Sequence, residues 1–418
     1  MQPQIRPRDC ADQRIRQSLF HDLQESMNYS TTTAVQDIPV NPSQAAATTT
    51  ALSSVARASQ REVEIDVLRG WCMVMMIMMH IGVHTRLSTV VHLHQYVTAA
   101  SGFVFLAGGM LGQVSRRRLE RESPAAAYRQ LGSRVLKLWL AHCVLMFGAV
   151  ILHETTGLLP KMAAVSEVGG WMNECWMIPT LRLQSEYYLN ILPMYIVFVA
   201  LAPLGLEAMR RRMTALLMIV SGLLYLAAQY DPGLGRIEHP ASGTQSFSLA
   251  AWQFLFFIGL ALGWHREKLT SDLWSRHRHW MLPGCVALGA AMFVLGIFQR
   301  PSLPSLHLLN EAAEALWFNR ITHAPGRLLA FFTAIVPGFY LIRCCLNHDK
   351  FPGPLRWLAT MGQSSLYCFL VHLFFALTFR AMNTWSWPLW SQEILTAGTV
   401  VVIYFMARHK SLSRLIPN

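Results

Sequence analysis

Charged side chains are scarce in this sequence, and acidic ones are the scarcest. Only 14% of its 418 residues are Asp, Glu, Lys or Arg, whereas a soluble domain carries about 25%. The 23 acidic residues stand against 35 Lys and Arg, which gives a formal net charge of +12. This balance excludes an acidic disordered chain and an ordinary cytosolic enzyme. Long apolar runs interrupt the positive charge, which argues against nucleic-acid binding.

Cysteine is also sparse, because the chain has only eight in its full length. None of them is spaced as Cys-x-x-Cys, so a thiol-bound metal site is not expected. Only Cys175 falls in a segment that we expect on the outer, oxidising side of a membrane. A single cysteine there cannot form an internal disulfide, which excludes a secreted disulfide module.

Apolar residues dominate what is present, at 53% of the chain. A helix needs about 20 apolar residues to cross the hydrocarbon of a bilayer. Stretches near this length recur at 67–85, 96–114, 135–153, 187–206, 214–230, 248–264, 281–298, 326–343, 361–380 and 391–407. The sequence therefore predicts an all-α, polytopic integral membrane protein with about ten transmembrane helices. The lipid bilayer is its expected surroundings.

The two ends of the chain differ from this membrane part. Residues 1–60 contain Thr and Ala triplets and few large apolar side chains. Such a segment buries too little apolar surface to offset its ordering entropy, so we expect a flexible tail. It also has no apolar run followed by a small-residue cleavage site, so it does not resemble a signal peptide. We expect a membrane domain over 61–410 and a short tail over 411–418.

The positions of Lys and Arg predict the orientation. With both termini in the cytoplasm, most basic residues of the connecting segments fall on the inner side, including 116–118 and 210–212. Two Gly-x-x-x-Gly pairs, at 108–112 and 259–263, predict places where helices pack closely.

The first expected span carries an arginine and a histidine. Arg69 and His80 are eleven residues apart, just over three helical turns, so they share one face about 16 Å apart. Ionisable groups inside a span are costly and are functional candidates. A cation near the inner mouth can hold an anionic donor, and an imidazole can take a proton from a hydroxyl. Alternatively, Arg69 extends to lipid headgroups and His80 bonds a neighbouring helix.

Further candidates for substrate binding lie within the expected spans or at their ends. Trp252 and Gln253 form an aromatic–amide pair of the kind that packs on sugar and hydrogen-bonds to it. The other members of the set are Asp66, Arg134, Glu186, Asn190, Arg327 and His372. The alternative for these residues is structural, as helix-end anchors or buried core histidines. His84, one turn after His80, allows a metal pair, but no carboxylate lies close in sequence and we predict no metal site.

Several stretches together resemble a known family. They are Glu64 to Gly70 with His80, Gly102 to Gly108, Ile191 to Val197 and Ala251 to Gly259, with weaker echoes at Arg327 to Phe331 and Gln363 to Tyr367. In this order they resemble the acyltransferase 3 group, and within it the OpgC family, which adds succinyl groups to osmoregulated periplasmic glucans. The likeness extends over residues 61 to about 372.

The resemblance implies an enzyme, with His80 as the essential base and Arg69 as its partner. It also implies an acyl-coenzyme A co-substrate entering from the cytoplasm, a periplasmic glucan as acceptor, no cofactor, and a place in the bacterial inner membrane. An outer-side arginine such as Arg327 could pair with the succinyl carboxylate. Two alternatives remain open: an O-acetyltransferase acting on another envelope polysaccharide, and a multi-span transporter.

Overall fold

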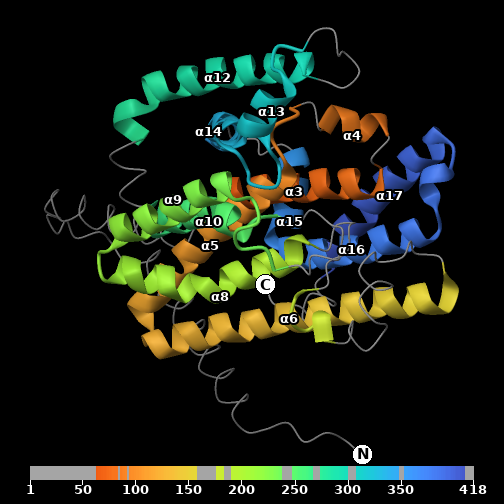
Figure 1. The fold of residues 1–418 in the computed structure, drawn as a ribbon, viewed down its shortest axis with the longest axis horizontal. Helices are drawn as coiled ribbons and strands as arrows, with labels where there is room; N and C mark the ends of the chain where they lie inside the picture. Colours follow the sequence, from red (N-terminus) through yellow and green to blue (C-terminus); the bar gives the residue numbers. More distant parts are fainter. Residues whose placement is uncertain are drawn as a thin grey trace, which may run out of the picture. The chain divides into compact units, whose positions relative to one another are not determined.

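The computed structural model describes residues 63–82, 85–91, 94–157, 176–182, 190–237, 247–266, 274–299, 307–347 and 353–409. All regular elements in these ranges are helices (Figure 1), in agreement with the predicted class. They are α3 Val63–Ile81, α4 Arg86–Val91, α5 Ala99–Arg121, α6 Pro124–Thr156, α8 Ile191–Arg210, α9 Thr214–Tyr230, α10 Leu249–Trp264, α12 Trp274–Phe298, α13 Glu311–Phe318, α14 Pro325–Asn347, α15 Gly353–Gln363, α16 Ser365–Ala381, the 3-10 turn η4 Thr384–Ser386 and α17 Leu389–Arg408. The expected tails 1–60 and 411–418 lie outside the described residues.

Each of the ten apolar stretches overlaps a helix in this part of the chain. Five helices, namely α6, α8, α12, α14 and α17, are long and apolar enough to cross a membrane. A bent pair, α15 with α16, makes a sixth if it counts as one span. The apolar helices α9 and α10 have only 17 and 16 residues. The described chain is thus a helical protein with five or six candidate spans.

Helix α3 is central in this arrangement. It contacts α4, α5, α14, α15, α16 and α17. Its residues Cys72 to Ile77 are all buried, which explains why a Met-rich, nearly uniform apolar run forms this helix. Any ionisable side chain on α3 is therefore held against other helices.

Glycines allow two pairs of helices to touch at their backbones. Helices α5 and α10 meet at both predicted Gly-x-x-x-Gly pairs: a Cβ on Gly108 would lie 2.3 Å from the Phe256 carbonyl oxygen, and one on Gly259 would lie 2.2 Å from that of Phe105. These distances confirm the expected close packing. In the same way, α15 lies against α3, because a Cβ on Gly362 would be 1.7 Å from the Asp66 oxygen.

The stretch 361–380, expected as one straight span, is broken. Helix α15 ends at Gln363, α16 begins at Ser365, and the two axes differ by 84°. Contact between Gly362 and α3 fixes the direction of α15, whereas α16 turns along α3 from the break onward. The break therefore places the first turn of α16 beside the first half of α3.

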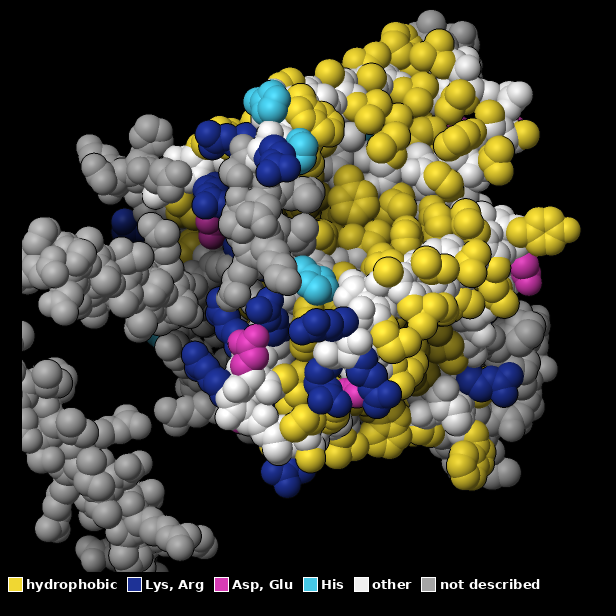
Figure 2. Space-filling model, turned by 90° about the vertical axis from the view of Figure 1, so that its left-hand side faces the viewer, with side chains coloured by type: hydrophobic (Ala, Val, Ile, Leu, Met, Phe, Trp, Pro, Cys, Tyr) yellow, Lys and Arg dark blue, Asp and Glu magenta, His cyan; other side chains and the backbone are white. Residues whose placement is uncertain are grey.

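Basic residues gather at one end of the helices. Helices α5, α8 and α10 end, and α6, α9 and α12 begin, on the left-hand side of Figure 1. Figure 2 looks onto this side, and many Lys and Arg side chains lie on it. Described members of this set are Arg116 to Arg118, Arg210 to Arg212 and Arg266.

Candidate active site

Polar side chains of α3 and α16 meet along one line, which we call the polar seam and define as Asp66, Arg69, His80, Ser365 and His372. Toward the start of α3, Arg69 Nη2 donates a hydrogen bond to Ser365 Oγ. Toward its end, His80 Nδ1 and His372 Nε2 are 2.9 Å apart and share a hydrogen bond. The two imidazole rings are stacked, with centroids 5.1 Å apart.

The spacing on the two helices explains why these contacts form together. Arg69 and His80 share one face of α3, as their separation of eleven residues predicts. Ser365 and His372 are seven residues apart on α16, about two turns, so they also share a face. The break before Ser365 starts α16 at the level of Arg69. The sequence prediction of one polar face on α3 is therefore matched by a second one on α16.

The seam is largely enclosed by protein. His372 and Ser365 are buried, and His80 is half-buried. The Asp66 carboxylate lies 3.7 Å from Arg69 Nη1, with side-chain exposures of 1% and 15%. A buried carboxylate of this kind is stabilised by a nearby cation. Asp66 thus fixes the guanidinium, while the partial exposure of Arg69 and His80 leaves both reachable from outside the packed core.

The imidazole pair can hold and move a proton. If His80 Nδ1–H donates to His372 Nε2, the lone pair of His80 lies on Nε2, and Nε2 acts as a base. The opposite tautomer makes Nε2 of His80 a donor. In both cases the 2.9 Å contact fixes the orientation of the His80 ring.

Arg134 lies on a different helix, α6. Its Nη2 donates a 2.8 Å hydrogen bond to the hydroxyl of Tyr195 on α8. A run of rings connects Tyr195 with the seam through Phe103 and Phe369, with centroid distances of 5.5, 5.1 and 5.2 Å, the last to His372. Arg134 is therefore joined to the seam by packed rings and makes no direct contact with it.

Two predicted sugar-binding side chains are bonded inside the protein. Trp252 Nε1 donates to the Ile321 carbonyl at 2.9 Å, and the residue is 1% exposed. Gln253, 5% exposed, accepts a hydrogen bond from Ser221 Oγ and donates to the Ser221 carbonyl. These contacts tie α10 to α9 and to the turn before α14.

Arg327 also makes internal contacts, at the start of α14. Its Nε donates to the Phe318 carbonyl, and its guanidinium lies 5.8 Å from the Tyr96 ring centre. Asn190, half-buried, stands before α8 and makes no side-chain cap bond there. Glu186 and His84 lie outside the described residues. Within the part of the chain that is described, no three His, Cys, Asp or Glu side chains gather as a metal site would need.

One residue of the seam and one residue near it were not among the predicted ones. Ser365, the acceptor of the Arg69 hydrogen bond, stands in the stretch Gln363 to Tyr367, whose likeness to the family was the only signal. Arg320, in the turn after α13, is exposed and lies near enough for its charge to act on His80. Nothing in the local sequence marks Arg320, because 240 positions separate the two residues and only the fold brings them together.

The chain matches the model of a known protein family. The family model described as OpgC protein matches residues 61–414, which include every described helix. No curated protein matches the chain. No solved structure matches it either.

Proposed function

This chain belongs to the OpgC family, and on that premise we propose that it is an integral-membrane O-acyltransferase. It moves a succinyl group from cytoplasmic succinyl-coenzyme A to a hydroxyl of a periplasmic glucan. The observation that carries the proposal is the polar seam, in which Arg69 and His80 both face α16 from one side of α3. Ionisable groups placed at two depths of one helix suit a reaction that joins two compartments.

The proposed topology has ten crossings of the bacterial inner membrane, with both termini in the cytoplasm. Its support is the basic end of the helices (Figure 2), because Lys and Arg are enriched on the cytoplasmic side. Arg69 then lies in the inner half of the bilayer and His80 in the outer half. Residues 1–60 and 411–418 form cytoplasmic tails.

His80 is the general base. The glucan hydroxyl oxygen attacks the thioester carbonyl carbon while its proton passes to Nε2 of His80. The tetrahedral adduct collapses, the carbon–sulfur bond breaks, and the proton on His80 passes to the leaving thiolate. The products are a glucan succinyl ester and free coenzyme A. His372 is a positioning residue, because its hydrogen bond keeps Nδ1 of His80 protonated and Nε2 basic.

Arg69 holds the donor. Asp66 and Ser365 fix its guanidinium from two sides, so its charge is already placed when an anionic donor enters and little reorganisation is needed. Arg134 and the cluster Arg116 to Arg118 contribute further positive charge at the inner side, where the phosphates of coenzyme A remain.

Arg320 is the partner of the succinyl carboxylate. Its side chain is exposed and its charge reaches His80, whereas Arg327 is occupied by backbone carbonyls. A guanidinium can hold a carboxylate through two parallel hydrogen bonds. This contact favours a succinyl donor over an acetyl donor, which has no free carboxylate.

The test is glucan modification in a deletion strain that expresses each variant, read by mass spectrometry. His80→Ala is expected to lower succinylation by about 10²–10⁴-fold. The control is His279→Ala, which changes an exposed histidine of α12 and should leave succinylation unchanged. Normal succinylation by His80→Ala refutes the mechanism. Loss of a neutral substituent in the deletion strain indicates acetyl transfer, and purified protein that does not consume acyl-coenzyme A indicates a transporter.

A further inference from the structure

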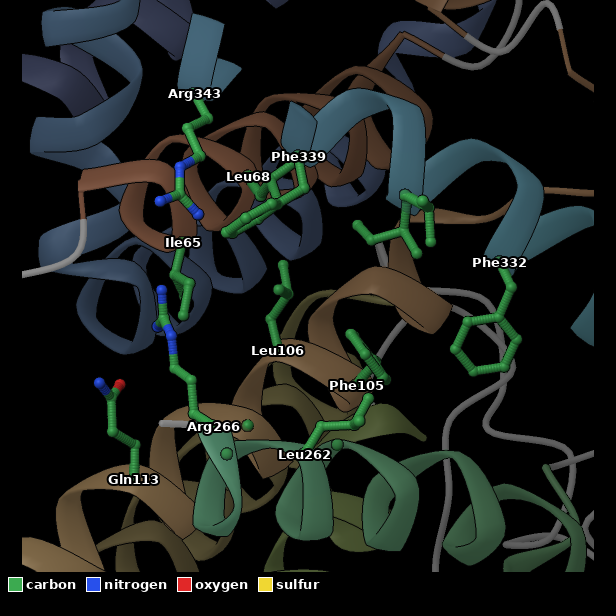
Figure 3. A pocket seen from close by; sticks show the side chains of 15 residues that line it. Ile65, Leu68, Phe105, Leu106, Gln113, Leu262, Arg266, Phe332, Phe339 and Arg343 are labelled. Carbon is green, nitrogen blue, oxygen red and sulfur yellow. The ribbon is translucent and has the colours of Figure 1, made fainter. Parts of the chain in front are cut away.

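A groove separate from the seam opens between α14 and the pair α5–α10, with one end at α3 (Figure 3). Its volume is about 280 Å³. Small-molecule pockets usually hold about 300–1,000 Å³, so the groove is near the lower end of this range and a larger ligand would extend out of it. Its walls are apolar side chains and glycines, among them Leu106, Leu262 and Phe339.

The charged residues of the groove lie together at one end. Figure 3 shows the guanidinium groups of Arg266 and Arg343 pointing toward one another past Ile65, with Gln113 beside them and Phe332 at the opposite end. Among the described lining residues there is no carboxylate. Burial, and then the charge of Arg343, lower the pKa of Arg266 to about 10. An anion between the two guanidiniums would relieve this repulsion.

The length of the groove fits one leaflet of a bilayer. Phe332 and Arg343 are eleven residues apart on α14, so the apolar wall that α14 contributes to the groove extends about 16 Å from the basic end. Half of the roughly 30 Å hydrocarbon thickness is about 15 Å. Arg266 follows α10, one of the helices that end on the basic side (Figure 1), and in the proposed topology lipid phosphates lie at this level.

The groove also occupies a face of α3 that differs from that of the seam. Its residues Ile65 and Leu68 are one turn apart. Their mean direction is about 100° around the helix from the face shared by Asp66, Arg69 and His80. A ligand in the groove therefore does not reach His80 along the seam.

We propose that this groove binds one anionic phospholipid, with its phosphate between Arg266 and Arg343 and an acyl chain along α14 toward Phe332. Basic pockets between membrane helices on the cytoplasmic side recognise such headgroups. The apolar walls favour an alkyl chain over the amide-containing arm of coenzyme A. Amides buried in the groove would need hydrogen-bond partners, and Gln113 is the only described lining side chain with an amide.

The experiment is native mass spectrometry of the full-length chain in detergent, titrated with phosphatidylglycerol or with phosphatidylcholine of the same chain length. We expect one phosphatidylglycerol to be retained in preference to phosphatidylcholine. The double variant Arg266→Gln/Arg343→Gln should lose affinity for phosphatidylglycerol by roughly 10- to 30-fold. The double variant Arg129→Gln/Arg408→Gln, which removes the same charge from exposed positions, should retain it.

A second pair of variants tests the chain-binding part without changing charge. Leu262→Trp fills the groove and should reduce retention of the lipid, whereas Leu223→Trp, on the exposed face of α9, should not. Equal retention of the two lipids, or equal loss in both double variants, overturns the proposal. Displacement of the lipid by coenzyme A also overturns it by assigning the groove to the donor, and the proposed acyl transfer would then still stand.

Discussion

Replacing His372 by Ala tests the part of the proposed mechanism that depends most directly on geometry. The substitution removes the ring that bonds His80 at 2.9 Å. Losing one hydrogen bond to a buried partner costs about 1–3 kcal/mol. If that energy orients His80 in the transition state, kcat falls by about 5- to 150-fold, because 1.36 kcal/mol corresponds to a factor of ten.

The assay is steady-state transfer from succinyl-coenzyme A by the purified protein, with kcat and KM determined across pH. KM for the donor should stay within about twofold, because Arg69 and Ser365 are unchanged. The acidic limb of the pH profile should move, because His80 must be deprotonated to act as the base and its proton affinity no longer depends on a second imidazole. A purely structural role for His372 would not move this limb.

The control is His142→Ala, which changes a fully buried histidine of α6 outside the seam. It should leave kcat and the pH profile unchanged. Two results would refute the reasoning. Full activity with an unaltered profile in His372→Ala would mean that His80 is oriented by other groups. A loss as large as that of His80→Ala in folded protein would mean that His372 itself contacts the reacting atoms.

Five further substitutions test the polar seam and three other places in the fold. Ser365→Ala should raise the donor KM several-fold with a small change in kcat. Arg69→Lys should lower kcat/KM by at least tenfold, because a lysine cannot bond Asp66 and Ser365 together. Steady-state kinetics with the donor check both variants. Gly362→Val should destabilise the protein by about 1–3 kcal/mol or more, because its Cβ would meet the Asp66 backbone. Gly353→Ala, whose Cβ would lie in open space, should not destabilise it. Thermal unfolding in detergent compares the two variants, and equal melting temperatures would contradict the packing of α15 on α3. Arg320→Gln should reduce succinyl transfer by about 10- to 100-fold and leave acetyl transfer unchanged. The control is Arg86→Gln, which changes an exposed arginine, and an equal loss with both donors in Arg320→Gln would rule out carboxylate recognition. Burial lowers the pKa of His323, in the turn before α14, to about 4, so folding favours its neutral form. The free energy of unfolding should therefore fall as the pH drops from about 6.5 toward 4, by roughly 3 kcal/mol at the lower end. His323→Asn, in which the new residue tolerates the left-handed backbone of this position, should flatten this dependence, and an unchanged pH dependence of the melting temperature would refute the prediction.

The helices were predictable because their information is local. Apolar runs of membrane length and the Gly-x-x-x-Gly pairs mark α5 and α10 directly, and the backbone contact at Gly108 confirms their use. The shared face of Arg69 and His80 follows from helical periodicity alone. The break before Ser365 was not predictable, because α15 takes its direction from contact with Gly70 and Asp66, almost 300 residues earlier in the chain.

Side chains at helix ends were the hardest to assign from sequence. Trp252, Gln253 and Arg327 have the chemistry to bind sugar or carboxylate, and the structure gives each of them backbone carbonyl partners. A hydrogen-bonding group at a helix end looks the same in sequence whether its partner is a ligand or another segment of the chain. Arg320 shows the converse, since only the fold brings its charge near His80.

Three features of α3 lie on different sides of the helix, so mutagenesis can address them separately. Gly70 presents the α3 backbone to α15, Ile65 and Leu68 line the groove, and Arg69 and His80 face α16. A large residue at Leu68 should therefore block the groove while leaving the bonds to Ser365 and His372 intact. Because the groove and the seam lie on different faces of α3, a lipid in the groove can influence the seam by shifting this helix. Bound lipid should accordingly change donor and acceptor kinetics together, and an effect on one substrate alone would argue for a direct contact with that substrate.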